Sequence, residues 1–384
     1  MRIVFVYPQF IHLAGTERVL IDKMNYLSSQ EDMNVYVVTY DQGTHPFAFP
    51  LAPSVNHIDL NICFYKLYRY NYFKRLFKWL KYRRLLRKRF IQLMAIVNPD
   101  IMIAITYHPY IMSLINACPG YFKKVLESHI DKCYLHSNDP VIRNNLFKRI
   151  KSIYSMVYLN HEARKFDILV SLHQKDANEW SKYLKTRVIT NIVHLNDTAR
   201  TSNLESKHII FVGRYTIQKG IPDLFKIWDK VYQKHPDWHL DLFGDGDIRE
   251  IPYNEEYSIK KNIHIHPSDP DIFSRYIESA LFVLTSLYEP FGLVIPEAMS
   301  CGLPVISFDC PSGPANIIND GVDGFLIKNR DIDAFADKIS LLIESPSLRR
   351  EMGKAAILSS QRYSAEQIMP QWLNLFNELK NNPS

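Results

Sequence analysis

Residues 285–299 read TSLYEPFGLVIPEAM and follow the apolar run LFVL at residues 281–284. The run predicts a buried strand and the end of the stretch predicts a helix, so together they form a strand–loop–helix unit. Glu289 in the loop and Glu297 on the helix lie eight residues apart, and Gly292 between them lets the backbone approach a ligand closely. A helix that begins at a strand end presents backbone N–H groups to an anion such as a diphosphate. The two carboxylates can accept hydrogen bonds from sugar and ribose hydroxyls.

A second loop of this kind follows the apolar run IIFV at residues 209–212. Residues 213–220 read GRYTIQKG, which places Arg214 and Lys219 within reach of one diphosphate. Arg binds phosphate as a planar fork and Lys as a point charge. Both would neutralise the charge that grows on a departing nucleotide, which is electrostatic catalysis. The alternative is a pair of surface cations beside a turn, and this motif alone does not decide between the two interpretations.

Apolar runs that alternate with helical patterns predict parallel sheets covered on both faces. The runs occupy residues 2–7, 35–38, 101–105, 124–126, 168–170, 209–212, 240–243, 281–284 and 305–307. The polar stretch at residues 194–207 predicts a linker. We therefore expect an α/β protein with two doubly wound domains, residues 1–195 and 196–384. A final helix near residues 365–380 could pack back on the first domain. Such domains bind ligands at the carboxyl ends of their strands.

Composition excludes several classes of protein. The five cysteines are odd in number and show no C-x-x-C spacing, which argues against a disulfide framework or a zinc ribbon and favours a reducing cytosol. No apolar run is long enough for a signal peptide or a membrane-spanning helix. Residues 1–195 hold 27 lysines and arginines against 14 acids, a net +13, whereas residues 196–384 hold 19 against 26, a net −7. The first half should therefore meet an anionic partner.

The positive charge of the first half is concentrated between Lys66 and Phe90. This stretch holds 11 lysines and arginines and no acid, with aromatic residues interleaved. One helical face is apolar and carries Phe73, Leu76, Phe77 and Leu80. Such a helix can lie on an anionic membrane surface or contact a lipid diphosphate. The alternative is a solvated helix whose aromatics fill the core. Nucleic acid is the other common polyanion, but no recognition module is visible.

These motifs together resemble the retaining glycosyltransferases of family 4, which have the GT-B fold. The resemblance is carried by the E-x7-E of Glu289 and Glu297, and by the runs GRYTIQKG at 213–220, CGLPVI at 301–306 and DGVDGFL at 320–326. The run AGTERVL at 14–20 is similar to the glycine loop of that family. The resemblance spans nearly the whole chain and is sharpest over residues 208–330.

The resemblance implies two facing Rossmann-like domains with a cleft between them, and it implies a role for each motif. Glu297 should hold the donor ribose and Glu289 the hydroxyls of the transferred sugar, while Arg214 and Lys219 bind the diphosphate. The backbone that faces the donor should come from Gly15, Gly213, Phe291, Gly292, Leu293 and Val294. The family also places a histidine after a strand of the first domain. His129, in the run ESHID at 127–131, fits best, and His108 is its rival.

The resemblance also implies an activity. We expect transfer, with retention, of a hexose or N-acetylhexosamine from a nucleotide diphosphate sugar to a hydroxyl of a lipid-linked or growing surface glycan, such as lipopolysaccharide or capsule. The run SFDCPSGP at 307–314 is similar to family members that use UDP-sugars. We expect a cytoplasmic enzyme, peripheral on the inner face of the membrane, with no cofactor besides its donor. Alternatives are a nucleotide-sugar epimerase or hydrolase of the same fold, or a non-catalytic membrane- or RNA-binding protein.

We expect no metal ion in the site. The pattern D-x-D occurs at Asp245/Asp247, Asp269/Asp271 and Asp331/Asp333. Such pairs hold metal-bound nucleotide sugars in other glycosyltransferases, but here their settings predict turns and helix caps.

Overall fold

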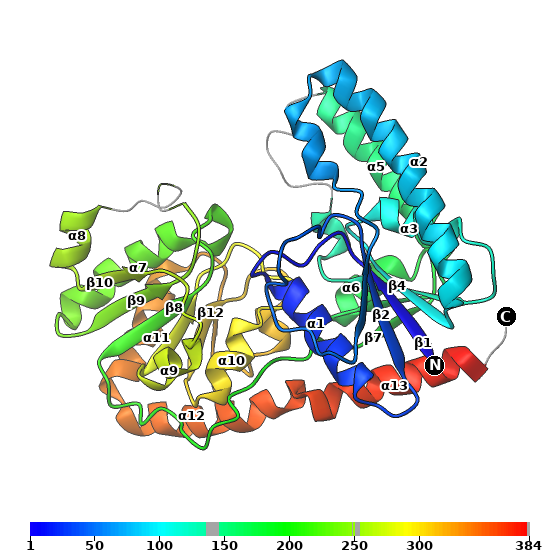
Figure 1. Ribbon diagram of the computed structural model, residues 1–384. Coiled ribbons are helices and arrows are strands. Elements are labelled where there is room, and N and C mark those ends of the chain that lie inside the picture. Colours follow the sequence, from blue (N-terminus) through cyan, green and yellow to red (C-terminus); the bar gives the residue numbers. More distant parts are fainter. Residues whose placement is uncertain (136–145, 248, 250–253, 382–384) are drawn as a thin grey trace. The chain divides into compact units, whose positions relative to one another are not determined.

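The computed structural model describes residues 1–135, 146–247, 249 and 254–381 (Figure 1). The chain divides into two compact units. Unit 1 contains Met1–Ile192 and Ile368–Ser384, and unit 2 contains Val193–Gln367. Each unit is built on a parallel β-sheet, which confirms the prediction of two doubly wound α/β domains.

The sheet of unit 1 has seven strands in the order β3-β2-β1-β4-β5-β6-β7. The strands are β1 (Arg2–Val6), β2 (Asn34–Thr39), β3 (Asn56–Asp59), β4 (Ile101–Ile105), β5 (Lys123–Ser128), β6 (Ile168–Ser171) and β7 (Thr186–Val188). The central strands β1 and β4 consist of buried apolar residues almost throughout, because helices cover both of their faces.

Helices pack around the sheet of unit 1, and the two longest, α2 (Tyr72–Val97) and α5 (Leu146–Ala163), share a core. The others include α1 (Gly15–Ser28), α3 (Pro109–Asn116) and α6 (Gln174–Trp180), with 3-10 turns η1 (Phe64–Arg69) and η2 (Lys132–Tyr134). The carboxyl-terminal half of α2 contributes Leu86 and Phe90 to the core that Leu159 and Ala163 of α5 also enter. Asn71 caps α2 by accepting a hydrogen bond from the amide of Lys74.

The sheet of unit 2 has six strands in the order β10-β9-β8-β11-β12-β13. The strands are β8 (His208–Val212), β9 (His239–Phe243), β10 (Ile263–His266), β11 (Leu281–Leu284), β12 (Val305–Phe308) and β13 (Gly324–Ile327). The helices are α7 (Ile221–Lys234), α8 (Glu255–Lys260), α9 (Ile272–Ile277), α10 (Val294–Ser300), α11 (Ile332–Glu344) and α12 (Pro346–Ser360), with a 3-10 turn η3 (Ile217–Lys219). The strand order reverses between β8 and β11, and ligands of doubly wound sheets bind at such a switch point.

The last helix, α13 (Ala365–Asn381), returns to unit 1 from Ile368 onward. Its apolar face is buried there, including Trp372. The indole of Trp372 covers the ammonium of Lys23 on α1, at 3.6 Å from the ring centroid. Glu378 forms a bidentate ion pair with Arg187 of β7, in which the shorter contact is 2.7 Å. These two contacts tie the helix to unit 1 at its middle and near its carboxyl end.

Candidate functional site

The loops that follow β8 and β11 press against each other at the switch point of unit 2. Gly220 has a φ of +65°, and a Cβ atom there would lie 2.0 Å from the carbonyl oxygen of Thr285. The amide of Leu287 donates to the carbonyl of Gln218 at 2.7 Å, and the side-chain amide of Gln218 donates to the carbonyl of Tyr288 at 3.1 Å. Only glycine allows this approach, so the two sequence motifs form one structural unit.

The contact between the loops places Lys219 on Glu289. The ammonium nitrogen lies 2.6 Å from Oε2 of the carboxylate, and the two side chains are 13% and 11% exposed. Ser286 donates a second hydrogen bond to the same oxygen at 3.1 Å. The backbone of Glu289 is fixed as well, because its amide donates to Pro311 and its carbonyl accepts from Gly313 at 2.6 Å. The site therefore offers a cation and a carboxylate that are rigid, desolvated and still reachable from solvent.

Glu297 and Gly292 belong to the same motif as Glu289. Glu297 is 6% exposed and sits on α10, which has seven residues. Gly292 has a φ of +95°, and a Cβ atom there would lie 3.0 Å from Cγ of Glu289. Phe291 is buried and packs edge-on against Tyr363. Leu293 precedes α10, and its carbonyl accepts a hydrogen bond from the amide of Glu297.

The structure brings some of the other predicted residues to this place. A Cβ atom on Gly213 would lie 3.2 Å from Cε of Lys219, so its backbone borders the lysine. Val294 is the first residue of α10, and Arg214 is exposed beside the loop. Gly15 is exposed at the start of α1 in unit 1. The roles of these residues in binding a donor remain predictions.

Arg330 is a site residue that the sequence did not reveal. Its guanidinium donates at 2.8 Å to the carbonyls of both Thr285 and Ser286, and at 2.6 Å to the carboxylate of Asp223. It also lies over the ring of Phe308, 4.3 Å from the centroid. Arg330 thus holds the loop after β11 from the β13 side. Arg330 also has a positive φ of +68°, which no pattern in the sequence indicates.

The two candidate histidines of unit 1 differ in their surroundings. His129 is 6% exposed, and its Nε2 lies 2.9 Å from Oε2 of Glu127 at the end of β5. His108 precedes α3 and packs against the rings of Tyr7 and Tyr107. Burial lowers the pKa of His108 to about 4, so this imidazole is neutral at physiological pH. Both follow strands, as predicted, and the choice between them as an active-site residue stays a prediction.

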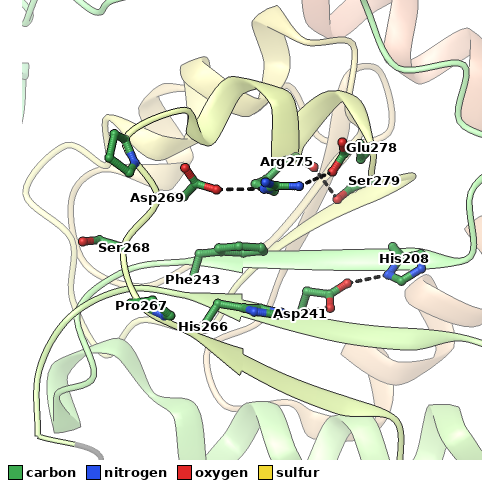
Figure 2. Close-up of a pocket in the computed structure, with 11 residues that line it drawn as sticks. His208, Asp241, Phe243, His266, Pro267, Ser268, Asp269, Arg275, Glu278 and Ser279 are labelled. Atoms are coloured by element: carbon green, nitrogen blue, oxygen red, sulfur yellow. Dashed lines mark hydrogen bonds and ion pairs between the residues drawn. The ribbon is translucent and has the colours of Figure 1, made fainter.

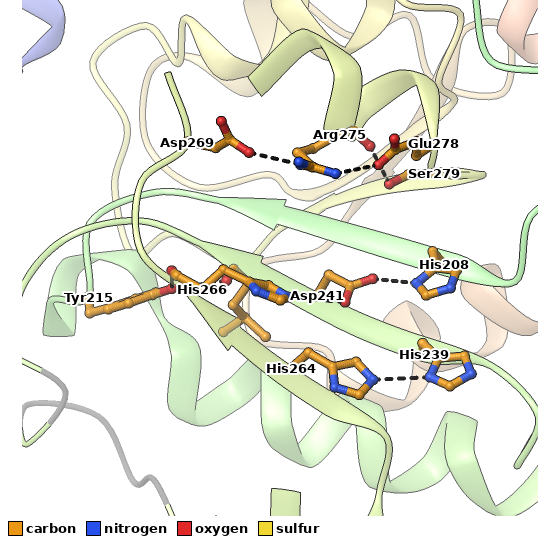
Figure 3. Close-up of polar contacts among 11 residues, drawn as sticks. His208, Tyr215, His239, Asp241, His264, His266, Asp269, Arg275, Glu278 and Ser279 are labelled. Atoms are coloured by element: carbon orange, nitrogen blue, oxygen red, sulfur yellow. Dashed lines mark hydrogen bonds and ion pairs between the residues drawn. The ribbon is translucent and has the colours of Figure 1, made fainter. Parts of the chain in front are cut away.

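A pocket of about 780 Å³ lies on the β8–β10 face of unit 2 (Figure 2). Figure 2 shows Arg275, held by Asp269 and Glu278, across from the rings of Phe243 and His266, which stack at 4.5 Å. The strand ends here adjoin the loop after β8, because the hydroxyl of Tyr215 lies within hydrogen-bond distance of the carbonyls of Leu242 and His266. The same face carries four histidines on neighbouring strands, shown in Figure 3. No motif in the sequence predicted this pocket.

Two of the D-x-D aspartates are helix caps, as the sequence predicted. Asp271 and Asp331 cap helices α9 and α11 by accepting hydrogen bonds from the amides of Ser274 and Ala334. Asp247 pairs with the exposed Arg249. Within the described ranges, no three histidine, cysteine or acidic side chains converge as metal ligands.

Part of the chain is similar to known glycosyltransferases. Residues 196–359 match the family model described as glycosyl transferases group 1. An uncharacterized glycosyltransferase of Haemophilus influenzae is 30% identical over 211 residues, which cover 54% of this chain and 60% of that protein. A poly(ribitol-phosphate) alpha-N-acetylglucosaminyltransferase of Staphylococcus aureus is 31% identical over 192 residues, covering 49% of this chain and 39% of that protein. These matches span less than two thirds of each relative's length. They support a glycosyltransferase domain of the group 1 type.

Solved structures extend the likeness to nearly the whole chain. The crystal structure of TarM has a TM-score of 0.76 at 17% identity and covers 98% of both chains. Anabaena HepE in complex with UDP has a TM-score of 0.71 at 18% identity, covering 98% of this chain and all of that one. At these identities the likeness shows the fold alone, and the fold is GT-B, as the sequence predicted.

Proposed function

We propose that this protein is a retaining glycosyltransferase of family 4. It moves a hexose or N-acetylhexosamine from a UDP-sugar to a hydroxyl of a lipid-linked or growing surface glycan, without a metal ion. The observation that carries the proposal is the Lys219–Glu289 pair, held by two loops at the switch point of the unit 2 sheet. The relative named as a poly(ribitol-phosphate) alpha-N-acetylglucosaminyltransferase, and the UDP in HepE, support the choice of donor and acceptor class.

The chemistry follows from the charges of the site. Lys219 has three N–H donors, of which Glu289 uses one, so the ammonium can also bind the donor diphosphate. Together with Arg214 it neutralises the charge that grows on the departing nucleotide. Glu289 binds hydroxyls of the moving sugar and stabilises the positive charge that develops at its anomeric carbon. Retention follows when the acceptor attacks from the side that the diphosphate leaves, and the leaving phosphate takes the acceptor proton.

The remaining parts of the donor fit the same unit. Glu297 accepts hydrogen bonds from the ribose hydroxyls. The stacked rings of Phe243 and His266, in the pocket that adjoins the loop after β8, offer a flat wall to the nucleobase. The donor is then bound along the carboxyl ends of the strands of one unit, where doubly wound sheets bind nucleotides.

The experiment that tests the proposal separates nucleotide binding from turnover. Glu297→Gln should weaken UDP binding by about tenfold or more, because it loses charge-assisted hydrogen bonds to ribose. Glu289→Gln should leave UDP affinity nearly unchanged and lower turnover, since UDP lacks the sugar. Titration calorimetry with UDP, run beside a transfer assay with UDP-sugars, provides the comparison.

Glu351→Gln is the matched control, because Glu351 is an exposed glutamate on α12 of the same unit. It should alter neither quantity. If neither Glu289→Gln nor Glu297→Gln affects binding or turnover, the donor site lies elsewhere and the proposal fails. Release of free sugar or an epimer without any acceptor would favour the hydrolase or epimerase alternative. Loss of transfer in EDTA, restored by Mn²⁺ or Mg²⁺, would overturn metal independence.

We infer further that unit 1 docks on the cytosolic face of an anionic membrane. The amino-terminal half of α2 presents an exposed apolar stripe at helical spacing, and α5 presents a second: Phe73, Leu76, Phe77, Leu80, Ile150, Ile153, Tyr154 and Val157. Both helices lie in unit 1 and share its core (Figure 1). Lysines and arginines flank the α2 stripe, which suits anionic head groups. Among the described residues, no helix has the length and hydropathy of a membrane span.

A liposome assay tests this second inference. Replacing Lys74, Arg75, Lys78 and Lys81 with Gln should weaken binding to phosphatidylserine vesicles, and added salt should weaken binding of the wild type. The control variant replaces Lys226, Lys230, Lys234 and Lys260 of unit 2 with Gln, which removes the same charge. Binding that is equal for all three proteins and insensitive to salt would refute the inference.

A further inference from the structure

Unit 1 contains its own pocket, of about 840 Å³, at the foot of the basic helix. It lies between the segment after β2, the turn η1 and the amino-terminal half of α2, with Tyr110 of α3 on the far wall. We call it the α2 pocket. Gln9 follows β1, and Tyr40 and Asp41 follow β2, so the pocket lies at the carboxyl edge of the unit 1 sheet. Doubly wound sheets bind ligands at that edge.

The walls of the α2 pocket combine aromatic rings with guanidinium groups. Arg83 lies over the rings of both Trp79 and Tyr110, at 4.5 and 4.3 Å from their centroids. Arg75 lies 5.9 Å from the ring of Tyr68. Flat rings bind the apolar faces of sugars, and an arginine fork binds phosphate oxygens. The packed rings restrict the rotamers of Arg83, so less conformational entropy is lost when it binds an anion.

Asp41 supplies a carboxylate to the same pocket. Its Oδ1 accepts a hydrogen bond from the amide of Phe64 at 2.5 Å, which fixes the side chain. Burial raises the pKa of Asp41 to about 6, and the nearby Asp59 acts in the same direction. A fixed carboxyl group beside aromatic rings is suited to sugar hydroxyls, which can both donate to it and accept from it.

The pocket is continuous with the exposed apolar face of α2. Tyr72, Leu76 and Trp79 line the pocket and are also among the exposed large apolar residues of the helix. The part of a bound ligand that extends out of the pocket therefore contacts apolar surface. This arrangement suits a molecule with a polar head and a long apolar tail, and the positive charge of the helix suits an anionic link between them.

We propose that the α2 pocket binds the head group of a lipid-linked saccharide, with its sugar on the aromatic wall, its phosphates on Arg75 and Arg83, and its lipid along the apolar face of α2. The inference rests on the proposed glycosyltransferase function and assigns the place where unit 1 holds the acceptor. It differs from membrane docking in kind, because it requires a defined pocket and a sugar, whereas docking requires only charge and apolar surface.

Calorimetry with three soluble probes tests the proposal on the full chain. The probes are decyl-diphosphate-linked N-acetylglucosamine, decyl diphosphate without sugar, and N-acetylglucosamine 1-phosphate without lipid. The complete probe should bind the wild type most tightly. Trp79→Ala and Arg83→Gln should each weaken it by about tenfold. Lys88→Gln, an exposed cation on the same helix outside the pocket, should leave the affinity unchanged.

UDP binding, measured on every variant, separates this inference from the proposed function. It should be the same in all of them, and thermal unfolding of each variant, compared with the wild type, shows whether unit 1 folds. If wild type binds UDP but not the complete probe, the α2 pocket is not the acceptor site, while the glycosyltransferase proposal stands. Decyl diphosphate that binds as tightly as the complete probe would overturn the sugar assignment. Absence of probe binding, together with a dimer that Trp79→Ala converts to a monomer, would make this face a self-association surface. Failure to bind UDP at all is instead a failure of the proposed function.

Discussion

Each unit holds a lysine–glutamate pair at the carboxyl end of its sheet, and the two pairs differ in burial. Lys23–Glu127 in unit 1 and Lys219–Glu289 in unit 2 both have N–O distances of 2.6 Å. The side chains of the first are each 3% exposed, and those of the second are 13% and 11% exposed. We call them the sealed pair and the open pair. The two pairs have the same N–O distance, but only the open pair is partly exposed to solvent.

The sealed pair is enclosed by the protein itself. Trp372 of α13 covers the ammonium of Lys23, and His129 shares the Oε2 oxygen of Glu127. Burial would raise the pKa of Glu127, but the charge of Lys23 and the hydrogen bond from His129 outweigh it and lower the pKa to about 2. The pair joins β5 to α1, and through Trp372 it also anchors the end of the chain.

In the open pair, protein contacts fix Glu289 and its loop, while Lys219 remains accessible to solvent. Ser286 and the loop at residues 311–313 fix Glu289, and Arg330 fixes the loop that carries it. A ligand can therefore reach Lys219 without unfolding any element. A preformed charge pair therefore serves stability when it is covered and binding when one side remains open.

The largest effect is expected from breaking the sealed pair. Lys23→Met removes the cation and leaves a buried carboxylate, which should lower the free energy of unfolding by about 3–5 kcal/mol. Urea unfolding at pH 7 measures it. Adding Glu127→Leu should restore much of the loss, because no uncompensated charge then remains. If Lys23→Met is as stable as the wild type, the pair is not structural and the comparison fails.

Breaking the open pair should affect turnover instead. Lys219→Met should reduce turnover by about 10²- to 10³-fold, because a cation that faces the leaving diphosphate is lost. The free energy of unfolding should fall less than in Lys23→Met, since Glu289 keeps its hydrogen bond from Ser286 and is more exposed than Glu127. Transfer assays and urea unfolding of the same preparation give both values. A loss of unfolding free energy as large as that of Lys23→Met would show that the two pairs contribute equally to stability.

A smaller effect is expected from a variant that shifts the open pair without removing either of its charges. Arg330→Lys keeps the charge but loses the fork that binds two carbonyls, so turnover should fall by about tenfold through misplacement of Glu289. UDP affinity should change little. Arg249→Lys is the matched control, since Arg249 forms an exposed pair with Asp247. Unchanged turnover in Arg330→Lys would mean that the loop is held by its backbone contacts alone.

Much of the fold could be predicted from the sequence, and the limits have a physical cause. Central strands such as residues 101–105 and 281–284 are apolar on both faces, so each forms a recognisable run. The strands that were missed lie toward sheet edges or begin with glycine. They are β3 (NHID), β7 (TRV), β10 (IHIH) and β13 (GFLI). An edge strand covers less of the core, so its sequence carries less of the apolar signal.

The site was predictable in its loops but not in its contacts. The two glycine-containing loops were found because each follows an apolar run. The contact of Lys219 with Glu289 joins residues 70 apart, and that of Lys23 with Glu127 joins residues 104 apart. Arg330 reaches the site only because β13 lies next to β12 in the sheet. No spacing in one sequence encodes such neighbours, since they depend on strand order.

A third charge pair extends the comparison to the exposed extreme. His208 Nδ1 lies 2.6 Å from Oδ2 of Asp241, with the side chains 44% and 12% exposed (Figure 3). The hydrogen bond to Asp241 raises the pKa of His208, against burial, which lowers it. A raised pKa means that the folded state favours the protonated imidazole. The stabilisation is complete below the unfolded pKa of about 6.5 and is lost as pH rises through the higher folded value.

The smallest effect is therefore expected from His208→Gln, and only in a defined pH range. Urea unfolding of wild type and variant should differ by at most about 1 kcal/mol at pH 6, because exposed pairs contribute little, and the difference should vanish toward pH 8.5. The other groups on this face are His239, His264 and His266, with Glu278 across the pocket. His239 has a pKa lowered by burial and by its histidine neighbours, so its own contribution has the opposite sign. Because His239 and Glu278 interact with His208, the variant also changes their contributions, and the difference between the two unfolding curves includes this coupling. A difference that grows with pH would contradict the raised pKa of His208. A difference that is unchanged in 1 M salt would show that solvent does not screen this pair.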